Sequence, residues 1–148
     1  MPDLTPGDAL PRSSDAELVE PLRDRYRDLL GFVPPRIDAR LRQLGALDAE
    51  MLVAQEEARR RAMYPDCLDQ KTVQLMLFGM LLILLRDAAV THGIAARRAG
   101  ATWKEMQAVV NLAYLFGGLS CANRGGEYLE KIAAREAEAR RAESGEHP

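Results

Sequence analysis

The sequence feature that most limits the fold is an unbroken apolar run at positions 75–85, which reads Leu-Met-Leu-Phe-Gly-Met-Leu-Leu-Ile-Leu-Leu. A helix that crosses a membrane needs roughly 20 apolar residues, and this run is well short of that length. Its leucines and methionines favour a helix over a strand. We therefore expect a helix here that is buried in a core or in an interface, and no membrane partner.

The composition of the whole chain also favours helices over strands. Its 148 residues suit one domain, and a 47% hydrophobic fraction with only 5% aromatic residues predicts a core of Leu, Ala, Val, Ile and Met. No segment alternates apolar and polar residues as a strand does. Twenty basic residues stand against 22 acidic ones, and this balance argues against a nucleic-acid partner. The predicted fold class is therefore all-α, with about six helices in one bundle.

Capping residues and helix breakers set the predicted boundaries. Capping boxes begin at Ser14 and at Thr102, and Asp48 and Asp69 are expected caps of two further helices. Glycines 117 and 118 should separate the last two helices. The predicted helices span 14–30, 35–44, 48–63, 69–99, 102–116 and 120–141. We expect a flexible N-terminal arm at 1–13, a single helical domain at 14–141 and a disordered tail at 142–148.

The two cysteines, Cys67 and Cys121, are far apart and form neither a CxxC motif nor a metal-ligand spacing. No signal peptide is recognisable at the N-terminus, so a reducing cytoplasm with two free thiols is expected. No metal site and no cofactor are predicted.

His92 is the first candidate for chemistry. Helical spacing places it on one stripe with Leu85, Ala88, Ala89 and Ala96, and the small residues around it leave room for a ligand. Imidazole exchanges protons near neutral pH, which suits a general acid or base. A structural histidine whose ring nitrogens are satisfied within the core is the alternative interpretation.

Other polar residues interrupt apolar helices and are candidates for ligand contacts. Arg86 follows the apolar run directly, where it marks either a pocket wall or the point at which the helix meets solvent. Asn111 and Tyr114 lie nearly one turn apart and would supply polar groups to one region, although each could equally bond a backbone carbonyl or a neighbouring subunit. Arg124 follows a glycine-rich helix start near Cys121, where amides and a guanidinium favour an anion, or where small residues simply let helices pack closely.

Taken together, the stretch from Leu68 to about Leu129 resembles the carboxymuconolactone decarboxylase family, whose wider group includes the alkylhydroperoxidase D-like proteins. The residues that carry the resemblance are the segments at 68–72, 99–102, 104–105 and 116–124, together with His92. The resemblance implies an all-helical subunit that assembles into dimers, trimers or hexamers. It also implies that His92 is the functional histidine.

The chain departs from the peroxidase branch of that group at the residues that carry its chemistry. Leu85 and Ala88 stand where that branch has the two cysteines of its CxxC motif. The peroxidase branch also has an acidic residue a few turns earlier, and this chain has Val73 or Gln74 at that position. A thiol peroxidase of that type is therefore excluded. The decarboxylase branch keeps the histidine without the cysteines, but the acidic residues that precede its histidine are reduced here to Asp87.

Two functions from different classes follow. The preferred one is a cofactor-free lyase or isomerase acting on a small carboxylated, possibly cyclic, substrate. His92 would donate the proton, Arg124 and Arg86 would bind the carboxylate, and Asn111 or Tyr114 would hold the oxyanion. The alternative is an oligomeric binding or scaffold protein that has kept the fold and lost the active site. A redox protein that uses Cys121 alone is a third possibility.

Overall fold

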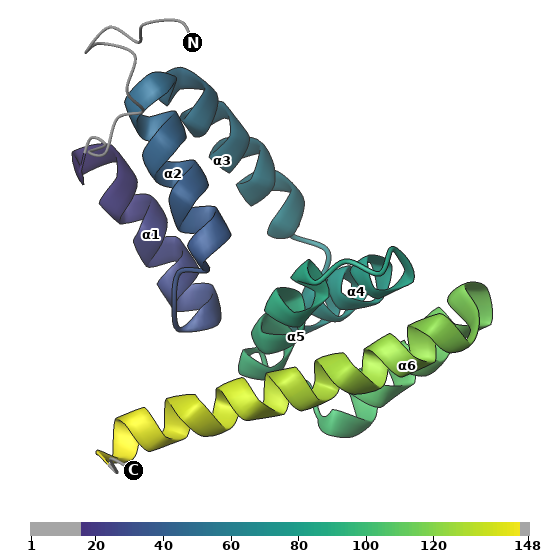
Figure 1. The fold of residues 1–148 in the computed structure, drawn as a ribbon. Coiled ribbons are helices and arrows are strands. Elements are labelled where there is room, and N and C mark those ends of the chain that lie inside the picture. Colours follow the sequence, from purple (N-terminus) through teal and green to yellow (C-terminus); the bar gives the residue numbers. More distant parts are fainter. Residues whose placement is uncertain (1–15, 146–148) are drawn as a thin grey trace, which may run out of the picture. The chain divides into compact units, whose positions relative to one another are not determined.

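The structure is a computed structural model that describes residues 16–145 (Figure 1). The predicted all-helical class is confirmed, because every regular element in that range is a helix. The predicted arm at 1–13, the first capping residue Ser14 and the second histidine, His147, lie outside the described residues. The helices are α1 (Ala16–Leu30), α2 (Pro35–Leu47), α3 (Ala49–Met63), α4 (Gln70–Ile83), α5 (Ala88–Arg98) and α6 (Trp103–Ser144).

The chain divides into two compact units, where the sequence predicts one domain over 14–141. Unit 1 is Met1–Met63 and contains α1, α2 and α3; unit 2 is Tyr64–Pro148 and contains α4, α5 and α6. The last helix also continues to Ser144, beyond the predicted end at 141, before Gly145 closes it with a φ of 71°. The two units are described separately below.

Unit 1 is built from three helices that pack in sequence order, α1 against α2 and α2 against α3. The buried apolar residues of α1 recur at helical spacing. Leu41 of α2 and Leu52 of α3, both fully buried, complete the core. Gly31, with a φ of 84°, ends α1, and Pro35 occupies the first position of α2, where its missing amide hydrogen costs nothing. Asp48 caps α3 as predicted, since its side chain accepts from the Met51 amide at 3.0 Å.

A buried carboxylate joins all three helices of unit 1. Glu56 of α3 is 2% exposed, and its Oε1 accepts a hydrogen bond from the Tyr26 hydroxyl of α1 at 2.8 Å. Arg40 of α2 donates to the same oxygen and also to the Tyr26 hydroxyl. Arg59 lies over the Tyr26 ring, 4.2 Å from its centroid. Burial, followed by the hydrogen bond to Glu56, raises the pKa of Tyr26 to about 12. The polar cluster therefore fixes how the three helices meet.

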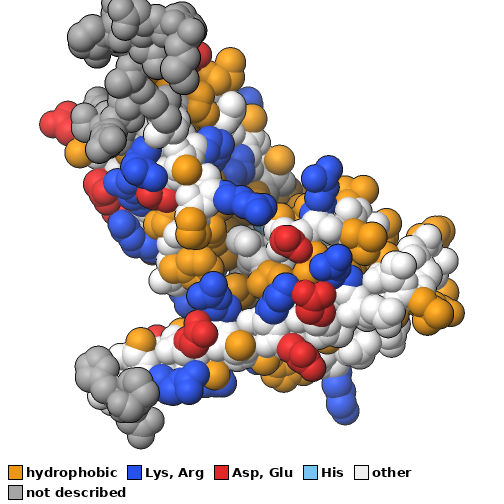
Figure 2. All heavy atoms as spheres, viewed as in Figure 1, with side chains coloured by type: hydrophobic (Ala, Val, Ile, Leu, Met, Phe, Trp, Pro, Cys, Tyr) orange, Lys and Arg blue, Asp and Glu red, His pale blue; other side chains and the backbone are white. Residues whose placement is uncertain are grey.

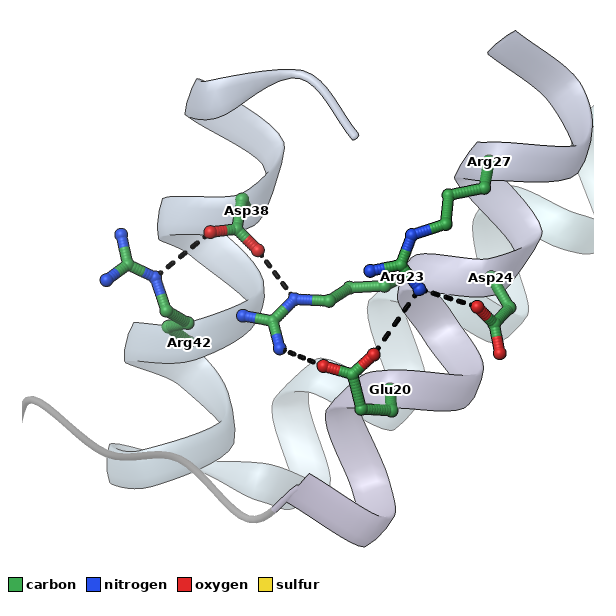
Figure 3. Close-up of polar contacts among 6 residues, drawn as sticks. All are labelled: Glu20, Arg23, Asp24, Arg27, Asp38 and Arg42. Atoms are coloured by element: carbon green, nitrogen blue, oxygen red, sulfur yellow. Dashed lines mark hydrogen bonds and ion pairs between the residues drawn. The ribbon is translucent and has the colours of Figure 1, made fainter. Parts of the chain in front are cut away.

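A second set of charges lies on the surface of α1 and α2. Arg23 joins the two helices, because its Nε donates to Asp38 at 2.7 Å while its guanidinium also pairs with Glu20 (Figure 3). Basic and acidic side chains gather over the same helices in the space-filling view (Figure 2). Such exposed pairs contribute little stability individually. The remaining members of the network are Asp24, Arg27 and Arg42.

In unit 2, the predicted continuous helix over 69–99 is wrong, because α4 ends at Ile83 and α5 begins at Ala88. Leu85 adopts a left-handed conformation with a φ of 53°, and the Arg86 amide donates back to the Leu81 carbonyl at 2.9 Å. These contacts close the end of α4, and the chain reverses so that α5 packs against α4. Non-glycine residues rarely adopt positive φ, so the apolar sequence does not indicate the turn.

The start of α6 agrees with the predicted capping box. The Thr102 hydroxyl accepts from the Glu105 amide at 3.1 Å, and the Glu105 carboxylate accepts from the Thr102 amide at 2.7 Å. Lys71 of α4 donates to the same carboxylate at 2.8 Å. Lys71 first, and then the capping amide, lower the pKa of Glu105 to about 2.

The break predicted at Gly117 and Gly118 is confirmed as a sharp bend inside α6. Gly118 has a φ of 67° and a ψ of −161°, a conformation that only glycine adopts readily. A Cβ placed on Gly125, after the bend, would lie 2.5 Å from Cγ1 of Val110, before the bend. The two halves of α6 therefore lie side by side, and Figure 1 shows the helix turning back at one end of unit 2.

Candidate functional site

His92 lies on α5, half-buried, and faces a fully buried amide on α4. Its Nδ1 is 2.8 Å from Oε1 of Gln74, a residue that is 0% exposed. The Gln74 amide nitrogen in turn donates to Oε1 of Gln70, one helical turn earlier, at 3.4 Å. This pair of bonds orients the Gln74 amide with its carbonyl oxygen toward the ring. With the Gln74 amide in this orientation, its carbonyl oxygen is the acceptor that faces Nδ1 of the ring.

Arg124 lies in a second region of unit 2, on the later half of α6. It lines an open cavity of about 370 Å³ together with Leu85, Ser120, Asn123 and Glu127. Its guanidinium contacts the Glu127 carboxylate at 3.4 Å, and Lys131 binds the same carboxylate at 2.6 Å. The left-handed residue of the α4–α5 turn thus forms one wall of the cavity that holds Arg124.

Cys121 is buried one turn before this arginine. Its thiol donates to the Leu82 carbonyl of α4 at 3.6 Å, and it is 1% exposed. A Cβ on Gly117 would lie 2.0 Å from its sulfur, so the glycine is needed for the thiol to fit. Cys67 is exposed, and both cysteines are free. The structure therefore gives Cys121 a packing role beside the α6 bend.

The three other predicted residues lie on the surface. Arg86 is exposed in the α4–α5 turn. Asn111 is exposed on α6 and accepts a hydrogen bond from the Gln107 side chain at 3.0 Å, and Tyr114 is also exposed. Neither the cavity around Arg124 nor the apolar groove described below contains His92, Arg86, Asn111 or Tyr114. The described contacts therefore join His92 to Gln74, and Arg124 to the α4–α5 turn.

One polar contact that the sequence reasoning missed links the turn to α6. The hydroxyl of Tyr128, a fully buried residue, donates to Oδ1 of Asp87 at 3.0 Å. Burial of the tyrosine, followed by this bond, raises its pKa to about 12. The only signal in the sequence is that Asp87 follows an apolar run, and nothing near it indicates a partner 41 residues later.

Unit 2 also carries an apolar groove between α4 and the first half of α6. Its volume is about 360 Å³, and Thr72 supplies the single polar side chain among the residues that line it. The two helices approach each other closely at the floor of the groove, since a Cβ on Gly79 would lie only 2.8 Å from Cγ1 of Val109. The remaining lining residues are Leu75, Met76, Met80, Ile83, Leu112, Ala113 and Phe116.

Several side chains of the groove point into solvent. Phe116 is 87% exposed and Leu112 is 62% exposed, although both are large apolar residues. In Figure 2, hydrophobic side chains gather on the surface over α4 and the bend of α6. An extended exposed apolar patch of this kind is typical of an interaction site. The apolar run at 75–85 predicts burial in a core or an interface, but nothing in the sequence indicates that α6 forms the second wall of a groove.

Within residues 16–145, no group of three or more His, Cys, Asp or Glu side chains is placed to hold a metal ion. In the same range, no helix is long and apolar enough to cross a membrane. Comparison with protein-family models, with curated proteins and with solved structures finds no match. The resemblance to the carboxymuconolactone decarboxylase family therefore stays a prediction.

Proposed function

We propose that this protein acts by binding, and that its binding surface is the apolar groove between α4 and the first half of α6. The observation that carries the proposal is the exposed, uncharged lining of that groove, with Phe116 at its end. Burying apolar surface of this kind is the main favourable term in protein association. The groove offers no cation for a carboxylate and one hydroxyl for orientation, whereas small-molecule pockets usually present several polar groups.

The exposed residues of the two walls favour a helical ligand. Met76, Met80 and Ile83 are spaced by four and three residues along α4, and Leu112 and Phe116 are spaced by four along α6. This spacing is typical of the seam along which amphipathic helices pack. The proposed ligand is therefore the apolar face of a helix.

A matched pair of substitutions tests whether the groove is the binding surface. Nile red, a dye that emits in apolar sites, is added to the protein at submicromolar concentration. Replacing Met80, 52% exposed in the groove, by Glu is expected to lower the emission several-fold, because a charge would then lie in the apolar lining. Replacing Met51, 48% exposed on α3, by Glu is the control and should leave the emission unchanged. Equal emission from both variants would contradict the proposal.

A second candidate function is acid–base catalysis on a small carboxylated molecule, with His92 as the proton donor. The observation that favours it is the chain of hydrogen bonds from Gln70 through Gln74 to His92, which holds the imidazole ring against α4. Orienting a catalytic histidine through a second side chain is a common arrangement in enzymes.

The catalytic candidate is tested by deuterium exchange at the carbon next to the carboxylate, followed by NMR. The probes are a panel of small aliphatic and aromatic carboxylates, first ranked by how far they raise the melting temperature. If His92 transfers the proton, we expect exchange with the wild type and a loss of at least 100-fold in His92→Gln. The variant should keep its thermal shift with the same carboxylate. Unchanged exchange in His92→Gln, or no exchange in the wild type, would contradict this role.

A further inference from the structure

The exposed side chains around the groove form one continuous surface, which we call the apolar face. Its α4 members are separated by one turn each, and its α6 members surround the groove end before the bend at Gly118. The large exposed residues of the apolar face are Met76, Met80, Ile83, Leu112, Leu115 and Phe116.

The area of the apolar face is what a stable dimer needs. Weighting each of these side chains by its exposed fraction gives on the order of 700 Å² of exposed apolar surface, taking about 200 Å² for a fully exposed large side chain. A standard protein–protein interface buries about 800 Å² on each partner. Covering the apolar face with a helix pair of its own size would therefore bury an area of that order.

The apolar face can pack against the same face of a second copy without bringing like charges together. In a two-fold interface, residues near the axis meet the same residues of the other molecule, so a charge at the centre would repel itself. No residue that lines the groove is charged. Lys71, which directly precedes the lining residue Thr72, forms its ion pair with Glu105 inside unit 2.

The apolar face carries both a projecting aromatic side chain and the groove itself. Phe116 is its most exposed side chain, and the groove beside it has small residues, Gly79 and Ala113, between larger ones. Two copies related by a two-fold axis would each insert one aromatic ring into the recess of the other. Interface energy usually concentrates in such central aromatic residues, which fill pockets on the partner.

We propose that the occupant of the groove is the apolar face of a second copy of this chain. In this dimer, α4 and the first half of α6 from each molecule form an intermolecular four-helix bundle around the two Phe116 rings. This inference rests on the proposed function, since it names the helical ligand that the groove binds.

The test measures molecular mass by light scattering and by sedimentation as the concentration of the full chain is varied. We expect a monomer–dimer equilibrium in the wild type. Leu112→Glu should weaken the dimer by about 100-fold or more, because two buried charges enter one interface. The control is Leu47→Glu at the end of α2, since Leu47 is 63% exposed and Leu112 is 62% exposed. The control should leave the dissociation constant unchanged.

The outcomes separate this inference from the function on which it rests. Nile red emission per chain, recorded on the same samples, should fall as the dimer forms, because the second copy displaces the dye. A monomer at every concentration that still binds the dye in the groove would overturn the dimer and retain the binding surface. A monomer that binds no dye would overturn both. A dimer that Leu112→Glu does not weaken would show that the second copy docks elsewhere.

Discussion

Replacing Arg40 by Met is expected to lower the free energy of unfolding of unit 1 by about 3 kcal/mol. The substitution leaves Glu56 buried without its closest cation, while Oε2 of that carboxylate already has no hydrogen-bond partner. Arg59 remains 3.9 Å away and is too distant to replace the lost hydrogen bond. The loss is measured by hydrogen exchange of the amides of α1, α2 and α3 in increasing denaturant.

Arg42→Met is the matched control, because Arg42 lies in the same helix and pairs with the more exposed Asp38. It should change stability by less than about 0.5 kcal/mol. The double variant Arg40→Met with Glu56→Met tests the cause, since removing both charges should recover part of the lost stability. Equal effects of Arg40→Met and Arg42→Met would contradict the role given to the buried carboxylate.

Replacing Gly118 by Ala is expected to destabilise unit 2 by about 2 kcal/mol. No atom lies within 4 Å of the added Cβ, so the effect comes from the backbone conformation alone. Trp103 is the only tryptophan of the chain and lies at the start of α6, so its fluorescence during urea unfolding reports on unit 2. Arg97 stacks over the ring at 4.1 Å, and unfolding removes that contact.

Gly126→Ala is the control for this second substitution. A Cβ at Gly126 also meets nothing within 4 Å, but the residue is not among the glycines with positive φ. Alanine should therefore stabilise the helix there by about 0.5–1 kcal/mol. If both glycine substitutions moved the urea midpoint in the same direction, the bend would not depend on the conformation of Gly118.

Much of the helical framework could be predicted from the sequence, because its boundaries depend on local chemistry. Asp48, Asp69 and Thr102 cap helices as predicted, since a side-chain oxygen three residues before an unpaired amide is sufficient for a cap. The turn at Leu85 was missed because it depends on tertiary contacts, including the bond between Tyr128 and Asp87. The run has its only glycine at position 79 and no proline, so no Gly or Pro stands near Leu85 to signal the turn.

The candidate site was less predictable than the helices. Periodicity placed His92 on a helix face, but its partner Gln74 comes from α4, and only the missed turn brings α5 back against that helix. Asn111 is predicted to need a partner because its neighbours in the helix are apolar, but it is exposed and bonds Gln107, and its neighbours Leu112 and Leu115 are exposed as well. An apolar stripe that meets another molecule has the same sequence pattern as one that meets the core.

The bend at Gly118 also determines whether two chains can exchange helices. A straight helix with the 42 residues of α6 would be about 63 Å long, and its later half would lose the packing against Val110. If the bend opened, that half would find the same packing site on another molecule. The conformation of one glycine thus decides whether the later half of α6 packs within its own chain or on a neighbouring chain. An exchange of this kind between identical chains is domain swapping.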